Sequence, residues 1–281
     1  MLYSLAMGRR RQPDSRADAS RKYHNRVAKQ YDQIYDDRYW EFHDELTWRA
    51  IKAHLPESTT SACLDLGCGT GKWGLKVLKS GFPTTFVDHS PNMIEQARVK
   101  VEAMGPRAKH ATLMVGDIVD LSALPGNHFA LTLAMGDPLS ICSDAAAAVG
   151  EMFRISQTGG VVIATADNKL AAIDHFIEQG DLDALEIFVR SGRTHWLTDD
   201  RREQFELTMF TPQTLRRVFE KAGFNIVEIT GKTILPLRKH KELLENSEAV
   251  ERLLQLEREL SRDPTSAGRA SHLQIVARKP A

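Results

Sequence analysis

The chain has 281 residues, of which 42% are hydrophobic, and its 37 basic and 37 acidic residues cancel to a formal net charge of zero. This balance excludes a global electrostatic field that would recruit nucleic acid or acidic lipid. The three cysteines lack the paired spacing of a zinc site and are too few for a disulfide framework. Because no run approaches the roughly 20 apolar residues that span a bilayer, we expect a globular, cytoplasmic protein without a membrane partner.

The N-terminal segment is predicted to be a disordered tail over residues 1–20. Its composition turns to Arg, Asp, Ser, Gln and Pro, which cannot bury enough surface to offset the entropy of ordering. The rest of the chain, residues 21–281, is predicted to form one domain that begins with covering helices at residues 21–55. Within them Tyr31 and Tyr35 stand one helical turn apart and share a face, suited either to core packing or to covering a ligand.

Short apolar runs alternate with helix-length segments in the predicted core, residues 56–167. The apolar runs are residues 62–66, 84–87, 111–115, 129–134 and 161–165, and the helical candidates are residues 72–80, 91–104 and 143–156. Continuous hydrophobicity is typical of strands that are covered on both faces, and the alternation favours a parallel sheet with right-handed crossovers. The sequence therefore predicts an α/β fold.

The C-terminal part continues the pattern with two insertions. Thr211 precedes a proline that begins a helix, Gly223 is suited to end it, and strands are expected at residues 226–230 and 272–277. Residues 168–210 and 238–265 do not fit the alternation, although their apolar spacing is helical. We expect these two insertions to form helical caps over the strand ends, with packing on the flank of the sheet as the alternative.

The stretch CLDLGCGTGKWG, residues 63–74, joins the first predicted strand to the first helix. Such a glycine-rich turn lets a ligand approach the backbone closely. Lys72 stands where the dinucleotide fingerprint has its third glycine, and the Asp65 carboxylate would repel a pyrophosphate but attract a cation. The motif therefore favours a cationic ligand with an adenosine-like part, such as S-adenosylmethionine, over a nicotinamide dinucleotide.

The motif Asp65-Leu66-Gly67-Cys68-Gly69-Thr70-Gly71 resembles the first motif of the class I S-adenosylmethionine-dependent methyltransferases. The resemblance implies a Rossmann-like, seven-stranded, mostly parallel sheet in the order 3-2-1-4-5-7-6, with the last strand antiparallel and helices on both faces. It also implies that the loop surrounds the methionine part through Gly67, Cys68, Gly69 and Gly71. Asp65 would help to hold the ammonium group, often through water.

Further cofactor contacts follow from positions in register with the later strands. Asp88, with His89 beside it, ends the second apolar run, and in the family a carboxylate here accepts the ribose hydroxyl hydrogens. Asp117 and Ile118 follow the third strand, where the resemblance implies an acidic contact to the adenine amino group and an apolar wall. Met93 could pack on the other face of adenine. Alternatively, Asp117 is a turn residue and Met93 belongs to the helix core.

The fourth strand ends at Met135 and Gly136, which should border the transferred methyl group. Asp137 follows at the position where some amino-methyltransferases have Asp-Pro-Pro-Tyr to hold a nitrogen nucleophile. Leu139 and Ser140 replace the second proline and the aromatic residue, so Asp137 is either a contact to the acceptor or a turn residue. The tyrosines of residues 21–55 resemble those of a helix that folds over the cofactor in many small-molecule methyltransferases.

A general base is needed if the acceptor keeps a proton at neutral pH. His43, His175 and His195 lie in the predicted covering segments, and we select His195 because its neighbour Trp196 could line an apolar pocket. An ordinary, partly exposed histidine is the alternative at each position.

The sequence therefore predicts a methyltransferase that moves a methyl group from S-adenosyl-L-methionine to an O, N or C atom of a small organic acceptor and releases S-adenosyl-L-homocysteine. We expect no metal and no nucleic-acid partner, and a homodimer is compatible with the sequence. Two alternatives remain, a methyltransferase of RNA or protein and a non-catalytic regulatory or assembly protein that binds the cofactor.

Overall fold

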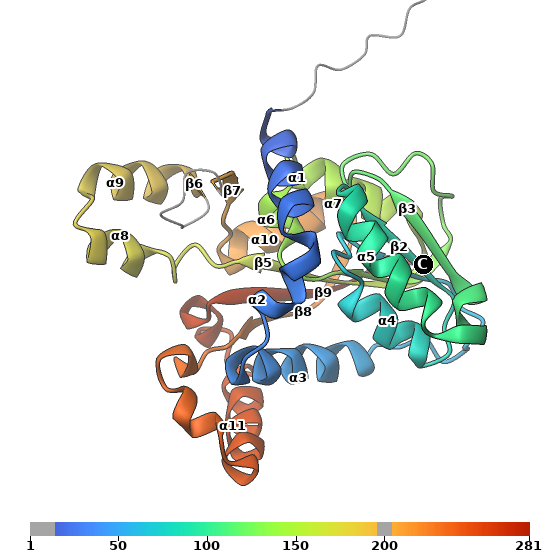
Figure 1. Cartoon of the computed structure of the whole chain (residues 1–281). Coiled ribbons are helices and arrows are strands. Elements are labelled where there is room, and N and C mark those ends of the chain that lie inside the picture. The colour runs from blue at the N-terminus through green and yellow to red at the C-terminus, as the bar shows by residue number, and fades with distance from the viewer. Residues whose placement is uncertain (1–14, 196–203) are drawn as a thin grey trace, which may run out of the picture.

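The computed structural model describes residues 15–195 and 204–281, and a twisted seven-stranded sheet lies at its centre (Figure 1). The strands of this sheet are β1 (Cys63–Leu66), β2 (Thr84–Asp88), β3 (Ala111–Val115), β4 (Phe129–Ala134), β5 (Ser156–Asp167), β8 (Asn225–Lys232) and β9 (His272–Arg278). Their order is β3-β2-β1-β4-β5-β9-β8, which confirms the predicted order once the strands of this sheet are numbered along the chain.

Strands β1 to β5 pair in parallel, whereas β9 runs antiparallel to both β5 and β8. The predicted antiparallel last strand is therefore confirmed. Because β9 runs against its neighbours, its first residue lies at the edge where the other strands end. Asp167 at the end of β5 pairs with His272, and His272 pairs in turn with Lys232 at the end of β8.

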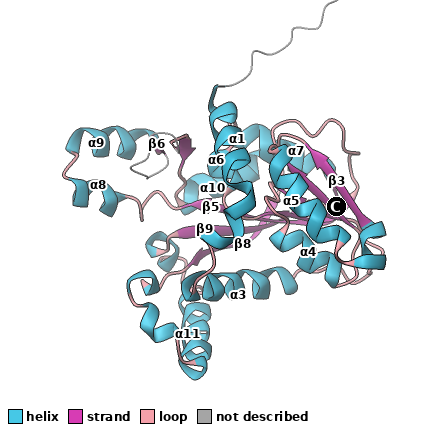
Figure 2. Cartoon of the chain, viewed as in Figure 1, coloured by secondary structure: helices cyan, strands magenta, loops and turns pink. Residues whose placement is uncertain are grey.

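Helices cover both faces of the sheet, as Figure 2 shows. The α-helices are α1 (Ser15–Val27), α2 (Tyr31–Ile34), α3 (Arg38–Lys52), α4 (Lys72–Lys79), α5 (Pro91–Glu102), α6 (Pro138–Ile141), α7 (Ala145–Ile155), α8 (Ile173–Gln179), α9 (Leu182–Ser191), α10 (Pro212–Ala222) and α11 (Ser247–Leu260). Along β5, Val162 and Ala164 join the cluster that contains α7 and α10, while Val161 and Ile163 join the cluster of α3 and α4. This alternation buries both faces of the sheet, as the continuous apolar runs predicted.

The helix boundaries follow local capping chemistry. The Ser90 side chain accepts a hydrogen bond from Met93 N at the start of α5, and Thr211 forms a capping box with Thr214 at the start of α10. Gly223 ends α10 with a φ of 104°, a left-handed conformation that favours glycine. The predicted boundaries of α4, α5 and α7 agree with the observed ones to within two residues, whereas β5 begins five residues before the predicted strand at residues 161–165.

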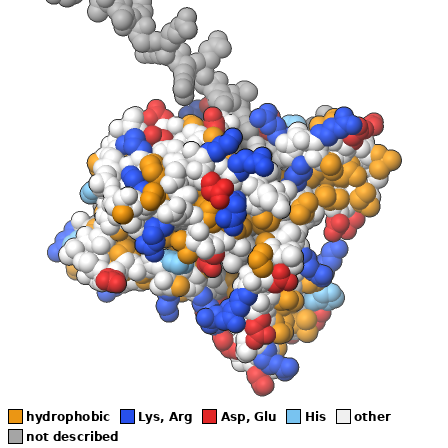
Figure 3. Space-filling model, turned by 180° about the vertical axis from the view of Figure 1, so that it is seen from behind, with side chains coloured by type: hydrophobic (Ala, Val, Ile, Leu, Met, Phe, Trp, Pro, Cys, Tyr) orange, Lys and Arg blue, Asp and Glu red, His pale blue; other side chains and the backbone are white. Residues whose placement is uncertain are grey.

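The insertion at residues 168–210 differs from its predicted all-helical form. It contains α8, α9 and a two-stranded antiparallel sheet of β6 (Arg193–His195) and β7 (Glu206–Thr208). This lobe projects beyond the central sheet at the left of Figure 1. In the view from behind, apolar side chains gather over the same lobe at the right (Figure 3), and the most exposed among them include Ile177, Leu182 and Ile187.

In the insertion at residues 238–265, helix α11 packs on α3, while Arg238 lies over the ring of Trp40. Leu254 of α11 shares a buried cluster with Phe42 of α3, and Arg49 forms an ion pair with Glu251 at 3.1 Å. Helix α11 therefore packs beside α3, and whether the insertion acts as a cap stays a prediction.

The N-terminal helix begins earlier than expected. Helix α1 starts at Ser15, and Ser20 is fully buried, so residues 15–20 of the predicted tail are helical. The remainder of that prediction, residues 1–14 with their arginine run, lies outside the described residues. In the part of the chain that the structure describes, no helix has both the length and the apolarity that crossing a bilayer requires.

Candidate functional site

A cavity of about 740 Å³ opens at the carboxyl edge of the parallel strands. Its wall combines the glycine loop, the residues that follow β2, β3 and β4, the ends of β5, β8 and β7, and the N-terminal helices α1, α2 and α3. Open α/β sheets bind ligands in the crevice outside the carboxyl ends of their strands. The cavity is therefore the first candidate for the active site.

The glycine loop forms one wall of this cavity through its backbone. Gly67 and Gly69 have φ values of 68° and 53°, which side chains rarely adopt. A Cβ atom at Gly67 would lie 2.9 Å from the Cβ atom of Pro138, so no larger residue fits there without movement. The amides of Gly67 and Cys68 donate to the Val87 carbonyl at 2.8 and 3.0 Å, which ties the loop to the end of β2.

Asp88 fixes the shape of the same wall. Its Oδ2 atom accepts a hydrogen bond from Gly69 N at 2.9 Å, and its Oδ1 atom accepts one from Ser90 N at 2.8 Å. A carboxylate offers about four acceptor positions, so Asp88 can still accept hydroxyl hydrogens from a ligand in the cavity. Asp117 also lines the cavity, while its Oδ1 atom accepts from Val119 N at 3.1 Å, so a turn role and a ligand role are compatible there.

Asp65 lies beneath the loop and does not line the cavity. It is 1% exposed, and its Oδ2 atom accepts from Gly74 N at 2.7 Å in the first turn of α4. Burial raises its pKa to about 7 and the nearby Asp88 adds to the rise, while the Gly74 hydrogen bond opposes it. Its Oδ1 atom is buried without a hydrogen-bond partner among the described residues. Asp65 is therefore absent from the cavity wall, and its predicted contact to the ammonium group, often through water, stays a prediction.

Helix α2 covers the glycine loop from the opposite side. Asp32 accepts a hydrogen bond from Thr70 Oγ1 at 2.6 Å and one from Lys100 Nζ at 2.5 Å, so a single carboxylate joins α2 to the loop and to α5. The rings of Tyr31 and Tyr35 line the cavity with their centroids 5.1 Å apart. The covering role that the sequence predicted for this segment agrees with its position.

Four ionisable side chains meet at the other end of the cavity, namely those of Asp137, Asp167, Lys232 and His272. His272 Nδ1 lies 2.9 Å from Asp137 Oδ2 and 3.9 Å from Asp167 Oδ1. Asp137 has a φ of 62°, an uncommon conformation for a residue with a side chain. Its amide and that of Gly136 both donate to Thr165 Oγ1 at 3.0 Å, which holds this turn against β5.

The carboxyl groups of Asp137 and Asp167 are both buried, but their pKa values are shifted in opposite directions. Burial alone would raise the pKa of Asp137, but the charge and hydrogen bonding of His272 lower it to about 2. Burial and the charge of Asp137 raise the pKa of Asp167 to about 7. Burial lowers the pKa of Lys232 to about 8. Titratable groups whose pKa values are separated in this way are suited to opposite roles in proton transfer.

A family model for a methyltransferase domain matches residues 63–160, the segment that contains the glycine loop, Asp88, Asp117 and Asp137. The chain is an S-adenosylmethionine-dependent methyltransferase with a class I fold. Among the curated proteins similar to it, the demethylmenaquinone methyltransferases of Staphylococcus aureus strains JH9 and Newman are 27% identical over 215 residues. The match covers 74% of this chain and 85% of theirs.

Solved structures share the fold of this methyltransferase. A SAM-dependent methyltransferase from Methanosarcina mazei has a TM-score of 0.60 at 19% identity, over 82% of this chain and 97% of its own. A geranyl diphosphate methyltransferase in complex with GPP and sinefungin has a TM-score of 0.55 at 14% identity, over 81% of this chain and 75% of its own. Likeness at this level of identity concerns the fold alone.

The methyltransferase uses S-adenosylmethionine, which when bound supplies an electrophilic methyl group on a sulfonium. The residues of the cavity fit such a cofactor. The glycine loop presents backbone without side chains, Asp88 keeps free acceptor positions, and the apolar Ile118 and Met135 offer surface to an adenosine group. The buried, unpartnered Oδ1 of Asp65 places negative character directly below the loop.

The cavity brings together most of the residues predicted from the sequence. Those that line it are Tyr31, Tyr35, Gly67, Cys68, Gly69, Asp88, His89, Asp117, Ile118, Met135, Gly136 and Asp137. Gly71 is the left-handed N-cap of α4, and Met93 is fully buried in a cluster with α1, so neither reaches the cavity. For Met93, the helix-core alternative is correct.

The histidine selected as a base does not lie at the cavity. His195 is an exposed residue at the end of β6, and no residue of β6 lines the cavity. Its neighbour Trp196 lies outside the described residues. His175 of α8 is also absent from the wall, whereas His43 of α3 lines it. Sequence reasoning missed Asp167, Lys232 and His272, although each stands at the end or the start of a predicted strand.

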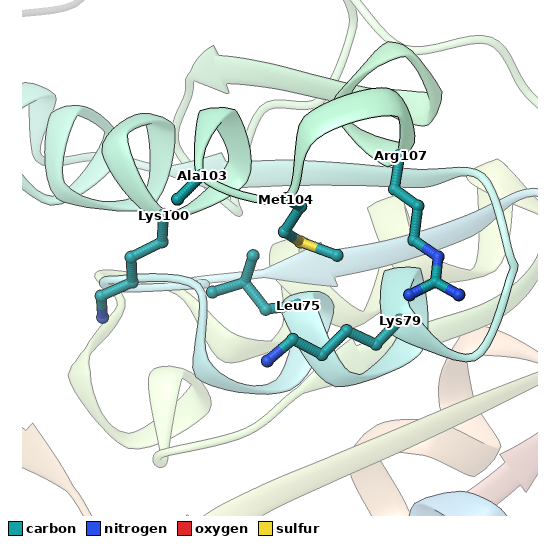
Figure 4. Close-up of a pocket in the computed structure, with 6 residues that line it drawn as sticks. All are labelled: Leu75, Lys79, Lys100, Ala103, Met104 and Arg107. Atoms are coloured by element: carbon teal, nitrogen blue, oxygen red, sulfur yellow. The ribbon is translucent and has the colours of Figure 1, made fainter.

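A second hollow of about 460 Å³ lies on the outer surface between α4 and α5 (Figure 4). It is lined by Leu75, Lys79, Lys100, Ala103, Met104 and Arg107. Lys100 is already paired with Asp32, and no carboxylate or nucleophile lies among the lining residues. The cavity at the strand edge is therefore where the methyltransferase has groups for chemistry.

Proposed function

We propose that this methyltransferase transfers the methyl group to an O, N or C atom of a small organic acceptor. The observation that carries this proposal is the single continuous cavity of about 740 Å³, which runs from the glycine loop to the ionisable cluster beneath helices α1 to α3. Drug-sized ligands occupy pockets of roughly 300–1,000 Å³, so a small acceptor can share this space with part of the cofactor.

The names of similar proteins support a small acceptor. The Staphylococcus aureus relatives are named for demethylmenaquinone, a small organic compound. The zero net charge of the chain agrees, since enzymes that act on nucleic acid more often present a basic face. We further propose that residues 21–281, together with the preceding turn of α1, work as one cytoplasmic domain.

We propose that the glycine loop, Asp88 and Asp117 hold the cofactor, with Gly67 and Gly69 beside its methionine part and Asp88 at its ribose. Tyr31 of α2 and Tyr35, which follows this helix, close this half of the cavity and exclude water from it. The acceptor then occupies the other half, where Trp40 and Asp137 line the wall. Holding the acceptor in line with the methyl group and sulfur supplies much of the acceleration in a displacement of this kind.

The proposal is tested by incubating the full chain with radiolabelled S-adenosylmethionine and a panel of small hydroxyl, amine and carbon-acid acceptors. We expect labelled methyl in at least one compound and S-adenosylhomocysteine in equal amount. Label that enters RNA or protein but no small compound would contradict the small acceptor. Tight binding of S-adenosylhomocysteine without any transfer would favour a non-catalytic role.

A further inference from the structure

The ionisable cluster is organised by strand register. His272, the first residue of β9, pairs with Asp167 of β5 on one side and with Lys232 of β8 on the other. Residues directly opposite one another in neighbouring strands project from the same face of a sheet. The three side chains therefore form a row at the edge of the sheet, and all three line the cavity.

Asp137 approaches this row from the turn after β4. Its Oδ2 atom lies at ion-pair distance, 2.9 Å, from Nδ1 of His272. Nδ1 is buried and has no other hydrogen-bond partner among the described residues, so a small rotation of the ring would complete a hydrogen bond to this carboxylate. Among the described residues no partner is found for Nε2, although the ring lines the cavity. Nδ1 thus faces the carboxylate, and Nε2 is the ring nitrogen left for a ligand. This is the arrangement by which a carboxylate fixes the orientation and tautomer of a histidine base.

Lys232 supplies a positive charge beside the same ring. Its Nζ atom donates to the neutral Thr47 Oγ1 at 2.8 Å, and the side chain is buried. Arg238, at the cavity mouth, lies over the Trp40 ring at 5.3 Å. These two cations disfavour an acceptor that binds as an ammonium ion and favour one that develops negative charge.

We propose that His272 is the general base of the methyl transfer and that the acceptor is an acidic hydroxyl compound, a phenol or an enol, whose developing oxyanion is stabilised by Lys232. Asp137 is a positioning residue that orients the imidazole ring. This inference rests on the proposed function, because it assigns the acceptor half of the same cavity.

The step balances in atoms and charge. The acceptor oxygen forms a bond to the methyl carbon, and the carbon–sulfur bond breaks with its electron pair remaining on sulfur. The hydroxyl proton passes to Nε2 of His272 and leaves to solvent when the products depart. No oxidant and no further reactant are required.

The groups that face His272 set the pH dependence. They are Asp137, Asp167 and Lys232, together with His43 of α3, whose ring lies 5.7 Å away. Burial lowers the pKa of His272, but the charges of Asp137 and Asp167 and the contact with Asp137 outweigh it and raise the pKa above 6.5. Activity should therefore rise with pH as His272 loses its proton.

The test compares the full chain with His272→Gln and with His195→Gln as a control that lies away from the cavity. The acceptors are phenol, 2-naphthol, 1,4-dihydroxynaphthalene and 4-nitrophenol, with benzylamine and histamine as amines. We expect His272→Gln to lose about 100-fold or more in kcat on the weakly acidic hydroxyl compounds. It should lose far less on 4-nitrophenol, because a substantial part of this compound is already ionised at neutral pH, while S-adenosylhomocysteine binding stays unchanged in both variants.

Asp137→Asn separates positioning from structural damage. Loss of the carboxylate charge lowers the pKa of His272, so the rising limb of the pH profile should move to lower pH, with lower kcat and unchanged cofactor affinity. A rising limb that stays in place would overturn the role of Asp137.

Several results would overturn the assignment of His272. These are a kcat of His272→Gln equal to that of the wild type, an equal loss of kcat on 4-nitrophenol and phenol, or methylation of amines but of no hydroxyl compound.

The ligand atoms of Asp137, Asp167 and His272 lie within 4.8 Å of one another. Activity that is lost in EDTA and restored by Mg²⁺ or Mn²⁺ would instead assign these groups to a cation. If the wild-type enzyme neither binds S-adenosylhomocysteine nor transfers a methyl group, the proposed function itself is wrong. That result differs from one in which only the role of His272 is wrong.

Discussion

Asp88 links the shape of the glycine loop to cofactor binding, and the variant Asp88→Ala tests this link. The carboxylate accepts one hydrogen bond from Gly69 N in the loop and one from Ser90 N before α5. In the variant both amides lose their acceptor, and the cavity loses the oxygens that we assign to the ribose hydroxyls. The change should therefore affect stability and binding together.

The expected size follows from these contacts. A hydrogen bond to a charged group contributes about 1.5–3 kcal/mol, and water that enters from the cavity will satisfy part of the loss. We therefore expect the free energy of unfolding to fall by about 2 kcal/mol, roughly one such bond. Loss of the ribose contacts should weaken S-adenosylhomocysteine binding by about ten- to a hundredfold, which corresponds to about 1.4–2.7 kcal/mol.

Asp144→Ala provides a matched control for this variant. Asp144 also accepts two backbone hydrogen bonds, from Ala146 N at 2.9 Å and Ala147 N at 3.0 Å, but it caps α7 and does not line the cavity. Its loss should cost about 1 kcal/mol of stability and leave binding unchanged. Calorimetric titration and thermal unfolding measure both quantities. Unchanged affinity in Asp88→Ala, or equal weakening in Asp144→Ala, would refute the reasoning.

Three further variants test other parts of the account. Asp32→Ala removes the carboxylate that accepts hydrogen bonds from both Thr70 and Lys100. Amide hydrogen exchange in residues 28–36 should therefore accelerate, and S-adenosylhomocysteine should bind a few-fold more weakly. Unchanged exchange would show that α2 is held by packing. Gly67→Ala places a Cβ atom against Pro138 in a residue with a φ of 68°. The free energy of unfolding, measured by urea denaturation, should therefore fall by about 1–3 kcal/mol. Wild-type stability would mean that the turn can change its conformation without cost. Asp65 has a folded pKa of about 7 against an ordinary value of 3.8, so its contribution to stability is present at low pH and is lost as pH rises from about 4 to 7. As pH rises through that interval, the free energy of unfolding of Asp65→Asn should therefore increase relative to that of the wild type by up to about 4 kcal/mol. A difference between the two proteins that does not change with pH would contradict the raised pKa.

The sequence was sufficient for features that depend on neighbours along the chain. The glycine loop, Asp88 and Asp117 each lie at or just beyond the end of a strand, and in a parallel sheet the ends of successive strands meet at one edge. Their positions could therefore be predicted without any long-range contact. The caps at Ser90 and Thr211 were predictable for the same reason, because capping depends on residues within one helical turn.

The acceptor half of the cavity could not be predicted in this way. His272 meets Asp167 and Lys232 through antiparallel pairing of β9 with β5 and β8, and the register of distant strands is not encoded in local hydrophobic patterns. The choice of His195 relied on an aromatic neighbour, which says nothing of where a segment folds. Asp65 shows a different limit, since a carboxylate before a glycine loop can serve the amide of Gly74 as well as a cationic ligand.

The most direct test of the central claim is a crystal structure of the full chain with S-adenosylhomocysteine bound. The account predicts the ribose on Asp88, the methionine part along the glycine loop, and the sulfur turned toward the space in front of Asp137 and His272. A molecule bound in the hollow between α4 and α5, or one whose sulfur faces away from His272, would contradict it.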